Sequence, residues 1–183
     1  MNQTQNKRIS IYFSYSWKKD EETSNGLTNN SHKAFLKIRE NLKSRMKELE
    51  NSYDFKRLRG SAGKNILDNI SYQIQKADLI IIDITSKNPN VMIELGMALA
   101  FKSNEIRKSI FLICEDEIKD HLPSNMSGYF VSHYIINEKA CTFKDNGSLL
   151  ASLSSEIKSI YRERNYDRFP EDRVDEIESD LEE

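Results

Sequence analysis

The hydrophobic positions of the chain follow two patterns, one typical of strands and one typical of helices. Runs of about four to eight apolar residues rich in Ile, Val, Tyr and Phe predict strands. Stretches in which apolar residues recur every three or four positions predict helices. Strands are expected at residues 8–15, 53–58, 79–84, 109–114 and 131–136, and helices at residues 31–46, 66–77, 88–101 and 149–161. Ser31 is the expected cap of the first of these helices.

The type of strand indicates the fold class. The run at residues 79–84 (LIIIDI) is apolar without alternation, which is typical of a strand covered on both faces of a sheet. Strands that alternate with helices imply parallel crossovers and therefore a doubly wound sheet. We predict a single α/β domain of the flavodoxin-like type over residues 1–165, with about five parallel strands in the order 2-1-3-4-5.

Charge is unevenly distributed along the chain. Residues 166–183 hold nine acidic and two basic residues, a net charge of −7, whereas the first 165 residues carry +5. We interpret residues 166–183 as an acidic tail and not as a second domain. The mildly basic body suits a ligand that bears phosphate, but no dense Lys/Arg stripe favours nucleic acid.

Composition excludes several classes of protein. With 38% hydrophobic and 31% charged residues, the chain has the balance of a folded, water-soluble protein. No apolar run approaches the roughly 20 residues that span a bilayer, and residues 1–6 lack the apolar core of a signal peptide, so a cytoplasmic protein is expected. Cys114 and Cys141 have neither a disulfide framework nor metal-ligand spacing, and no metal site is expected.

Polar side chains follow two strands of the predicted sheet. In open α/β sheets, ligands bind outside the carboxyl ends of the strands where the strand order reverses, here between the first and third strands. Ser14, Tyr15 and Trp17 leave the first of these strands, and Asp83 and Ser86 leave the other. Tyr15 or Trp17 could stack on a base, but either could equally belong to the edge of the core. Asp83 could close the site or simply tie down the loop that follows it.

The helix after the third strand carries an isolated carboxylate. Residues 91–101 (VMIELGMALAF) are apolar around nearly the whole helix, which predicts burial on most sides. Glu94 is the only ionisable residue in this segment, and buried carboxylates are rare unless a partner or a function retains them. Glu94 is therefore a candidate functional residue. The alternative is a carboxylate at a solvated gap or a subunit contact.

Three neighbours of Glu94 extend the candidate site. Asn88 is a plausible N-cap of the helix, with Pro89 at the first helical position, although it could also contact a ligand. Asn90 lies four residues before Glu94 and shares its helical face. Gly96 weakens the helix relative to Ala, which suggests the close approach of a backbone or a ligand.

Two segments resemble a known group of proteins. Residues 77–85 (ADLIIIDIT) followed by residues 88–96 (NPNVMIELG) resemble the motif of nucleoside 2-deoxyribosyltransferase-like proteins and, equally, that of the bacterial TIR-like nucleotide-binding proteins. Residues 11–16 (IYFSYS) are similar to the first strand of TIR domains, and residues 122–129 (LPSNMSGY) to a late loop of TIR-like proteins. The resemblance spans roughly residues 8–164.

The resemblance implies roles for individual residues. Glu94 matches the catalytic glutamate of the family, and Asp83 matches a polar residue that closes the site. The transferases often have aspartate six residues before that glutamate, where this chain has Asn88. This difference favours the TIR-like branch, whose members hydrolyse NAD-type dinucleotides or sense a nucleotide signal, many of them in bacterial antiviral defence.

The leading hypothesis is cleavage of an N-glycosidic bond in a nucleotide by Glu94, with NAD as a substrate and no cofactor. Ser86, Asn88 and Asn90 would hold ribose hydroxyls, while Tyr15 or Trp17 would stack on the base. A different class of function is a non-catalytic nucleotide-binding module that acts through self-association or a partner protein, with the predicted edge strand at residues 53–58 as a contact surface. Nucleoside 2-deoxyribosyl transfer is a third possibility.

Overall fold

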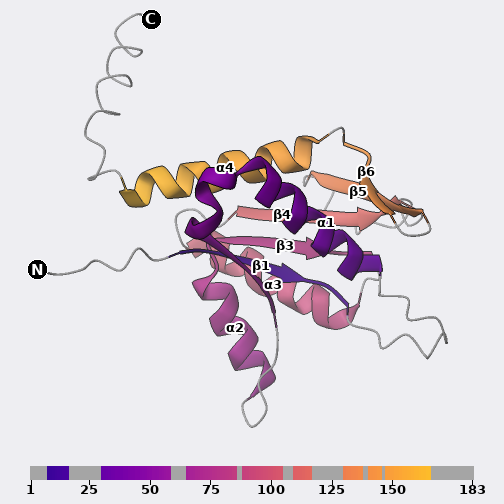
Figure 1. The fold of residues 1–183 in the computed structure, drawn as a ribbon. Coiled ribbons are helices and arrows are strands. Elements are labelled where there is room, and N and C mark those ends of the chain that lie inside the picture. Colours follow the sequence, from indigo (N-terminus) through magenta and orange to yellow (C-terminus); the bar gives the residue numbers. More distant parts are fainter. Residues whose placement is uncertain are drawn as a thin grey trace, which may run out of the picture.

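The computed structural model describes residues 8–16, 30–58, 65–85, 88–104, 109–116, 130–137, 140–145 and 147–165. These residues form an α/β structure around one six-stranded sheet in the order β2-β1-β3-β4-β5-β6 (Figure 1). The strands are β1 (Ile9–Ser14), β2 (Tyr53–Arg57), β3 (Leu79–Asp83), β4 (Ser109–Glu115), β5 (Val131–Asn137) and β6 (Ala140–Phe143). The late loop at residues 122–129 and the acidic tail at residues 166–183 lie outside the described residues.

The prediction of the sheet is confirmed for five strands and incomplete at one edge. β1 to β5 run parallel and follow the expected order 2-1-3-4-5. β6 pairs antiparallel with β5, with Tyr134 opposite Phe143, so the sheet has six strands and not five. The four-residue sequence of β6, ACTF, is too short and too mixed in polarity to predict a strand.

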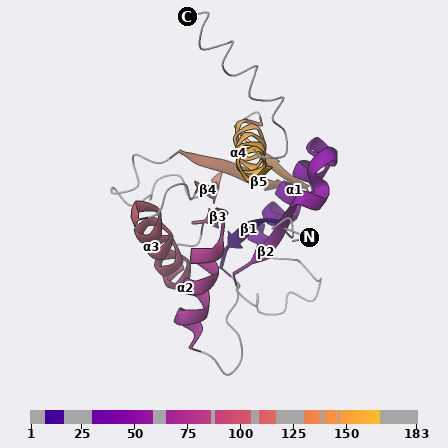
Figure 2. The same ribbon diagram turned by 90° about the vertical axis from the view of Figure 1, so that its left-hand side faces the viewer.

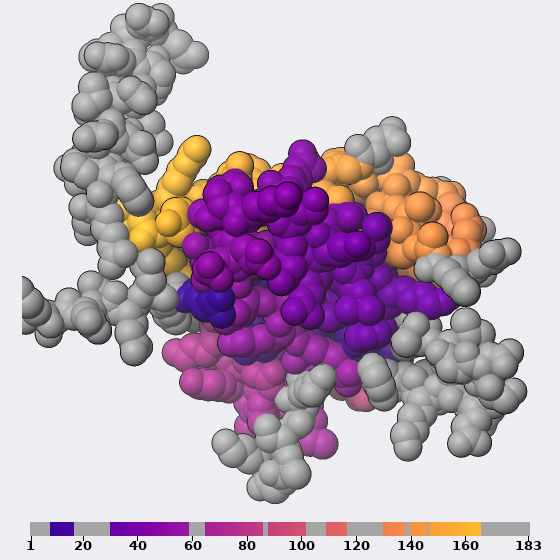
Figure 3. Space-filling model, in the orientation of Figure 1, coloured from indigo at the N-terminus to yellow at the C-terminus, as the bar shows by residue number. Residues whose placement is uncertain are grey.

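The helices lie in two layers, one on each face of the sheet (Figures 1 and 2). α1 and α4 cover one face, whereas α2 and α3 pack against each other on the opposite face. The space-filling view shows the first of these faces, with the α1–η1–β2 segment between the residues of α4 and those of α2 (Figure 3). The helices are α1 (Asn30–Arg45), the 3-10 helix η1 (Lys47–Ser52), α2 (Ile66–Lys76), α3 (Pro89–Asn104) and α4 (Ser148–Asn165).

Helix α1 begins one residue earlier than expected. Asn30 is already helical, so Ser31 lies in the first turn and is not the cap that the sequence suggested. The Ser31 side chain is buried and forms hydrogen bonds with groups of the sheet, which explains why a residue typical of caps occurs inside the helix.

Each face of the sheet has its own hydrophobic core. Ile9, Ile11 and Phe13 of β1 point toward α1 and α4. Ile80 and Ile82 of β3 point toward α2 and α3. All five residues of β3 are buried, as expected for a continuously apolar strand with helices on both sides. The doubly wound arrangement therefore follows from the residues that the sequence marked as strands.

Helix α3 is buried on one side only, which corrects the prediction that it is buried on most sides. Val91, Leu95 and Ala98 form its buried side, whereas Ile93 is 46% exposed. The helix belongs to an outer layer, where it packs mainly against α2, β3 and β4. Gly96 is exposed, and no atom of the described residues lies within 4 Å of the position of an added Cβ. The close approach predicted from this glycine is therefore not found in the described part of the chain.

The amino edge of the sheet ties the end of α4 to β1 and β3. The Asp78 carboxylate accepts hydrogen bonds from the backbone N–H of Ser10 at 2.7 Å and from its hydroxyl at 2.9 Å. Arg164, in the last turn of α4, also donates to Asp78. The start of β1 and the end of α4 are therefore fixed at the edge opposite the arrowheads of the parallel strands (Figure 1).

No described helix is long and apolar enough to cross a bilayer.

Candidate functional site

The strand order reverses direction at β1. This strand pairs with β2 on one side and with β3 on the other, so the crossovers leave from its two sides in opposite directions. Ser14 ends β1 and Asp83 ends β3. Ligands in open α/β sheets bind outside the carboxyl ends of the strands at such a point, so this edge is the expected position of a binding site.

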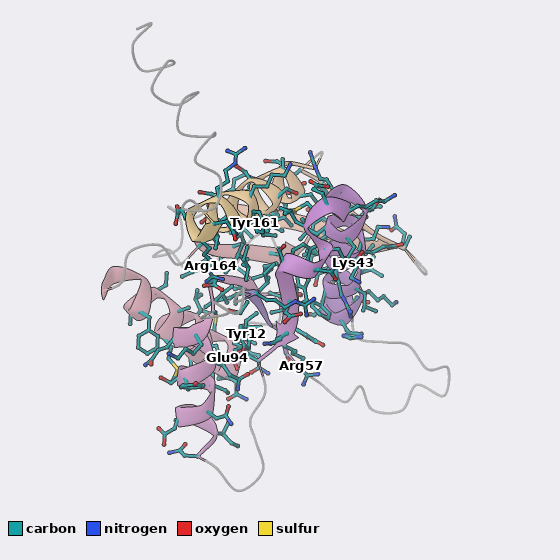
Figure 4. The ribbon with its side chains drawn as sticks, turned by 60° about the vertical axis from the view of Figure 1, so that its left-hand side comes forward. Tyr12, Lys43, Arg57, Glu94, Tyr161 and Arg164 are labelled. Carbon is teal, nitrogen blue, oxygen red and sulfur yellow. The ribbon has the colours of Figure 1, made fainter. Side chains whose placement is uncertain are left out.

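Glu94 lies at this edge and contacts the end of β1. The hydroxyl of Ser14, which is 1% exposed, donates a hydrogen bond to Oε2 of Glu94. Partial burial has the largest effect and raises the pKa of the Glu94 carboxyl, whereas the Ser14 hydrogen bond and the positive charge of Arg57 offset part of this rise. Figure 4 labels the Glu94 and Arg57 side chains. The structure therefore brings together two residues from different elements that the sequence named separately, Ser14 and Glu94.

Asn88 fixes the start of α3 against the end of β1. Its Oδ1 accepts the backbone N–H of Asn90 at 2.9 Å, which is the geometry of an N-cap. Its Nδ2 donates to the hydroxyl of Ser16 at 3.0 Å. The prediction of a cap is confirmed, and Asn88 also joins the helix that carries Glu94 to Ser16, two residues after the end of β1. Asn90 itself is exposed.

Asp83 belongs to a buried network and is 1% exposed. Its carboxylate accepts the backbone N–H and the hydroxyl of Thr85, and the hydroxyl of Tyr134 donates to it at 2.7 Å. Burial raises the pKa of Asp83, while these bonds and one from Ser31 lower it. The geometry matches the interpretation of Asp83 as the residue that ties down the loop after β3.

The network continues from Thr85 along the carboxyl edge to Glu115, Asn30 and Tyr134, which the sequence analysis did not select. The hydroxyl of Thr85 accepts the backbone N–H of Glu115 at 2.8 Å. Glu115 in turn accepts a hydrogen bond from Nδ2 of Asn30 at 2.9 Å. Tyr134 comes from β5 and is fully buried. Nothing in the local pattern around these residues indicates that they meet, because they are distant in the sequence.

Tyr15 forms the centre of an aromatic and basic cluster on the α1 face. Its ring is 7% exposed and lies 5.5 Å from the ring of Phe13 between centroids. The Arg57 guanidinium lies over the ring, 5.1 Å from its centroid. The Tyr15 hydroxyl and Nδ1 of His32 form a hydrogen bond of 2.8 Å. This arrangement favours the core-edge interpretation of Tyr15 over the stacking of a base on its ring.

Arg57 and His32 are the residues of this cluster that the sequence analysis missed. Burial and the nearby charge of Arg57 both lower the pKa of His32, so its imidazole is neutral at neutral pH. Arg57 ends β2, and the only sequence signal for its location was that the carboxyl end of β2 lies beside that of β1. Trp17 and Ser86, which were also predicted site residues, lie outside the described residues.

The described side chains offer little for metal or thiol chemistry. They include no group of three or more His, Cys, Asp and Glu residues placed to hold a metal ion. Cys114 is buried. Burial raises the pKa of the buried Cys141 thiol to about 11, which opposes formation of the thiolate.

No model of a known protein family matches the chain, and no curated protein shows significant similarity to it. The chemistry of this edge must therefore be inferred from its own residues. One half-buried carboxylate from α3, a guanidinium from β2 and hydroxyl and amide groups from β1 and the start of α3 meet around the end of β1.

Proposed function

We propose that the protein cleaves the N-glycosidic bond of a nucleotide, with NAD-type dinucleotides as the favoured substrates and Glu94 as the reacting carboxylate. The observation that carries this proposal is the contact between Glu94 and the hydroxyl of Ser14 at the point where the strand order reverses. A sugar bound across the end of β1 would place its anomeric carbon near this carboxylate.

The reaction needs one well-placed carboxylate when the base is cationic. As the bond from the anomeric carbon to nitrogen breaks, its electron pair leaves with the base and the sugar gains positive charge. Glu94 would either stabilise this charge while water adds to the anomeric carbon, or bond to that carbon and then leave as the carboxylate when water displaces it; in both cases the added water loses a proton to the solvent. A nicotinamide base leaves as a neutral molecule and needs no general acid, whereas a purine base usually needs protonation.

The surroundings of Glu94 suit a carboxylate that reacts in its ionised form. Partial burial raises the pKa of the Glu94 carboxyl above its ordinary value, and the hydrogen bond from Ser14 and the charge of Arg57 offset only part of this rise. A raised pKa makes the ionised carboxylate a stronger base and nucleophile. A carboxylate held in this way resembles the poised groups that function in active sites.

The resemblance of residues 77–85 and 88–96 to TIR-like and deoxyribosyltransferase-like proteins supports the same proposal. The strand order is compatible with a flavodoxin-like fold, the class to which we assign the chain. Under this proposal the protein acts in the cytoplasm, in the antiviral defence of a bacterium. Asn88, at the position where the transferases often have aspartate, is used as a helix cap, so hydrolysis is favoured over deoxyribosyl transfer.

A non-catalytic nucleotide-binding module is the alternative function, and one observation favours it. The Asp83 carboxylate is directed to internal donors from Thr85 and Tyr134, so it does not supply a second acid or base beside Glu94. A binding module needs no second group, because Glu94 would only accept hydrogen bonds from ribose hydroxyls. Such a module would act through self-association or through a partner protein.

The experiment that tests the proposal is chromatography of NAD, NADP and a panel of deoxynucleotides after incubation with the purified protein. We expect the wild type to release nicotinamide or free base, and Glu94→Gln to lower turnover by on the order of 10³-fold or more, because the variant loses the charge that acts on the anomeric carbon. Glu40→Gln is the matched control, since Glu40 is an exposed glutamate of α1. Wild-type turnover in Glu94→Gln with the fold intact would refute the role of Glu94.

A further inference from the structure

Arg57 is held in a defined orientation at the end of β2. Its Cα is paired with that of Phe13, so in this parallel pair the two side chains project from the same face of the sheet. Its guanidinium lies over the ring of Tyr15, 5.1 Å from the centroid, and Tyr15 is fixed by Phe13 and by its bond to His32. A cation placed over a rigid aromatic ring loses little side-chain freedom when it binds an anion.

Arg57 and Glu94 approach the end of β1 from opposite faces of the sheet. Tyr15, beneath Arg57, belongs to the core shared with α1 and α4. Glu94 instead projects from α3, on the other face, to the hydroxyl of Ser14. The two charges are close enough for Arg57 to lower the pKa of Glu94. The last residue of β1, Ser14, and the two residues that follow it therefore separate a carboxylate from a guanidinium.

This arrangement matches the polarity of a nucleotide. The anomeric carbon and the 5′-phosphate of a nucleotide lie at opposite sides of the ribose, and one becomes positive during cleavage while the other is an anion. The planar guanidinium forms paired hydrogen bonds with phosphate oxygens. His32 lies on the same side, where its Nδ1 and the Tyr15 hydroxyl form a hydrogen bond of 2.8 Å.

We propose that Arg57, supported by Tyr15 and accompanied by His32, binds the phosphate next to the ribose, so that the protein takes nucleotides and discriminates against nucleosides. The inference rests on the proposed function for the position of the sugar, and it adds the group that selects the substrate. Arg57 binds and orients the phosphate, while Glu94 acts at the other side of the sugar.

The test compares two ligands that share the same glycosidic bond and differ only in the phosphate. Nicotinamide mononucleotide and nicotinamide riboside are titrated by calorimetry into Glu94→Gln protein, in which turnover is suppressed. We expect the mononucleotide to bind about 10- to 100-fold more tightly, as for one charge-assisted contact with phosphate. Adding Arg57→Gln should remove this preference and leave the riboside affinity unchanged, whereas Arg39→Gln, an exposed arginine of α1, should retain it.

A second variant and a second measurement separate the possible failures. Arg57→Lys keeps the charge without the planar fork, and it should lose part of the preference if Arg57→Gln proves unstable. In protein that retains Glu94, Arg57→Gln should raise KM for the mononucleotide by a similar factor, with little change in kcat. The inference is overturned if the preference for the mononucleotide survives both Arg57→Gln and Arg57→Lys. It is also overturned if the Glu94→Gln protein, with Arg57 intact, shows no such preference. A preference that depends on Arg57 in a protein that cleaves no nucleotide supports the phosphate site and refutes the proposed reaction.

Discussion

Replacement of Tyr134 by Phe tests the buried hydrogen-bond network of Asp83, Thr85 and Tyr134 at the carboxyl edge of the sheet. The Tyr134 ring is fully buried and lies 5.9 Å from the ring of Phe143 between centroids, and Phe would keep this packing. The change removes only the hydroxyl, which donates to Asp83 at 2.7 Å and also lies 3.2 Å from the Thr85 hydroxyl. Hydrogen bonds to charged groups contribute about 1.5–3 kcal/mol to the free energy of unfolding. For a domain of this size that loss lowers Tm by about 3–12 °C.

The loss should depend on pH in a defined direction. Burial raises the pKa of Asp83 above its ordinary value of 3.8, so the folded protein binds this proton more tightly than the unfolded chain. The penalty for burying the charge is absent below 3.8 and develops as pH rises through the folded pKa. Because Tyr134→Phe removes a bond that lowers this pKa, its penalty is larger and becomes complete at a higher pH. The difference between variant and wild type should therefore grow from acid to neutral pH.

Urea and thermal unfolding at a series of pH values measure this difference directly. Tyr72→Phe is the matched control, because the Tyr72 side chain is 61% exposed and its hydroxyl is not part of the network. A loss of less than about 0.5 kcal/mol at neutral pH, or a loss that grows on acidification, would show that the Tyr134 hydroxyl does not stabilise an ionised Asp83.

Two further predictions concern the contacts of Glu94 and its helix. Ser14→Ala should raise the pKa of Glu94 further, because it removes a hydrogen bond to the carboxylate. The acid limb of the pH profile of kcat/KM should therefore move to higher pH. An acid limb that stays at the wild-type pH would count against the contact between Ser14 and Glu94. Asn88→Ala should lower the free energy of unfolding by about 1 kcal/mol through loss of the N-cap. Denaturant titrations measure this loss, with Asn90→Ala as the control because Asn90 is exposed. Equal losses in the two variants would contradict the capping role of Asn88.

Most of the sheet could be predicted because its signals are local. The continuous apolar run of β3 and the alternation of strands with periodic helical segments specify the class of fold and the order of five strands. β6 could not be predicted, since a four-residue strand owes its existence to pairing with β5 and not to its own pattern. The exposure of Ile93 on α3 was missed for the opposite reason, because an apolar sequence does not reveal which side of an outer helix a neighbour covers.

The candidate site shows the same division between local and distant information. Ser14 ends a strand, Asn88 caps the helix that follows β3, and Glu94 lies within the first two turns of that helix, so their positions in the sequence already indicated the carboxyl edge. Arg57 and Tyr134 reach that edge through the pairing of β2 and β5 with strands distant in sequence. A polar residue near the end of a predicted strand identifies an edge, but its partners there depend on register, which only the assembled sheet defines.

The fastening of α4 to the start of β3 has a practical consequence for handling the protein. Because Arg164 and Ser10 both bond to Asp78, the first and last described segments meet on the side of the sheet remote from Glu94 and Arg57. A tether or fluorophore joined to the chain next to Arg8 or Asn165 starts from this remote side. When the protein is immobilised through either point, its carboxyl edge faces the solution. The protein can therefore be oriented on a surface for binding experiments without altering any residue of the candidate site.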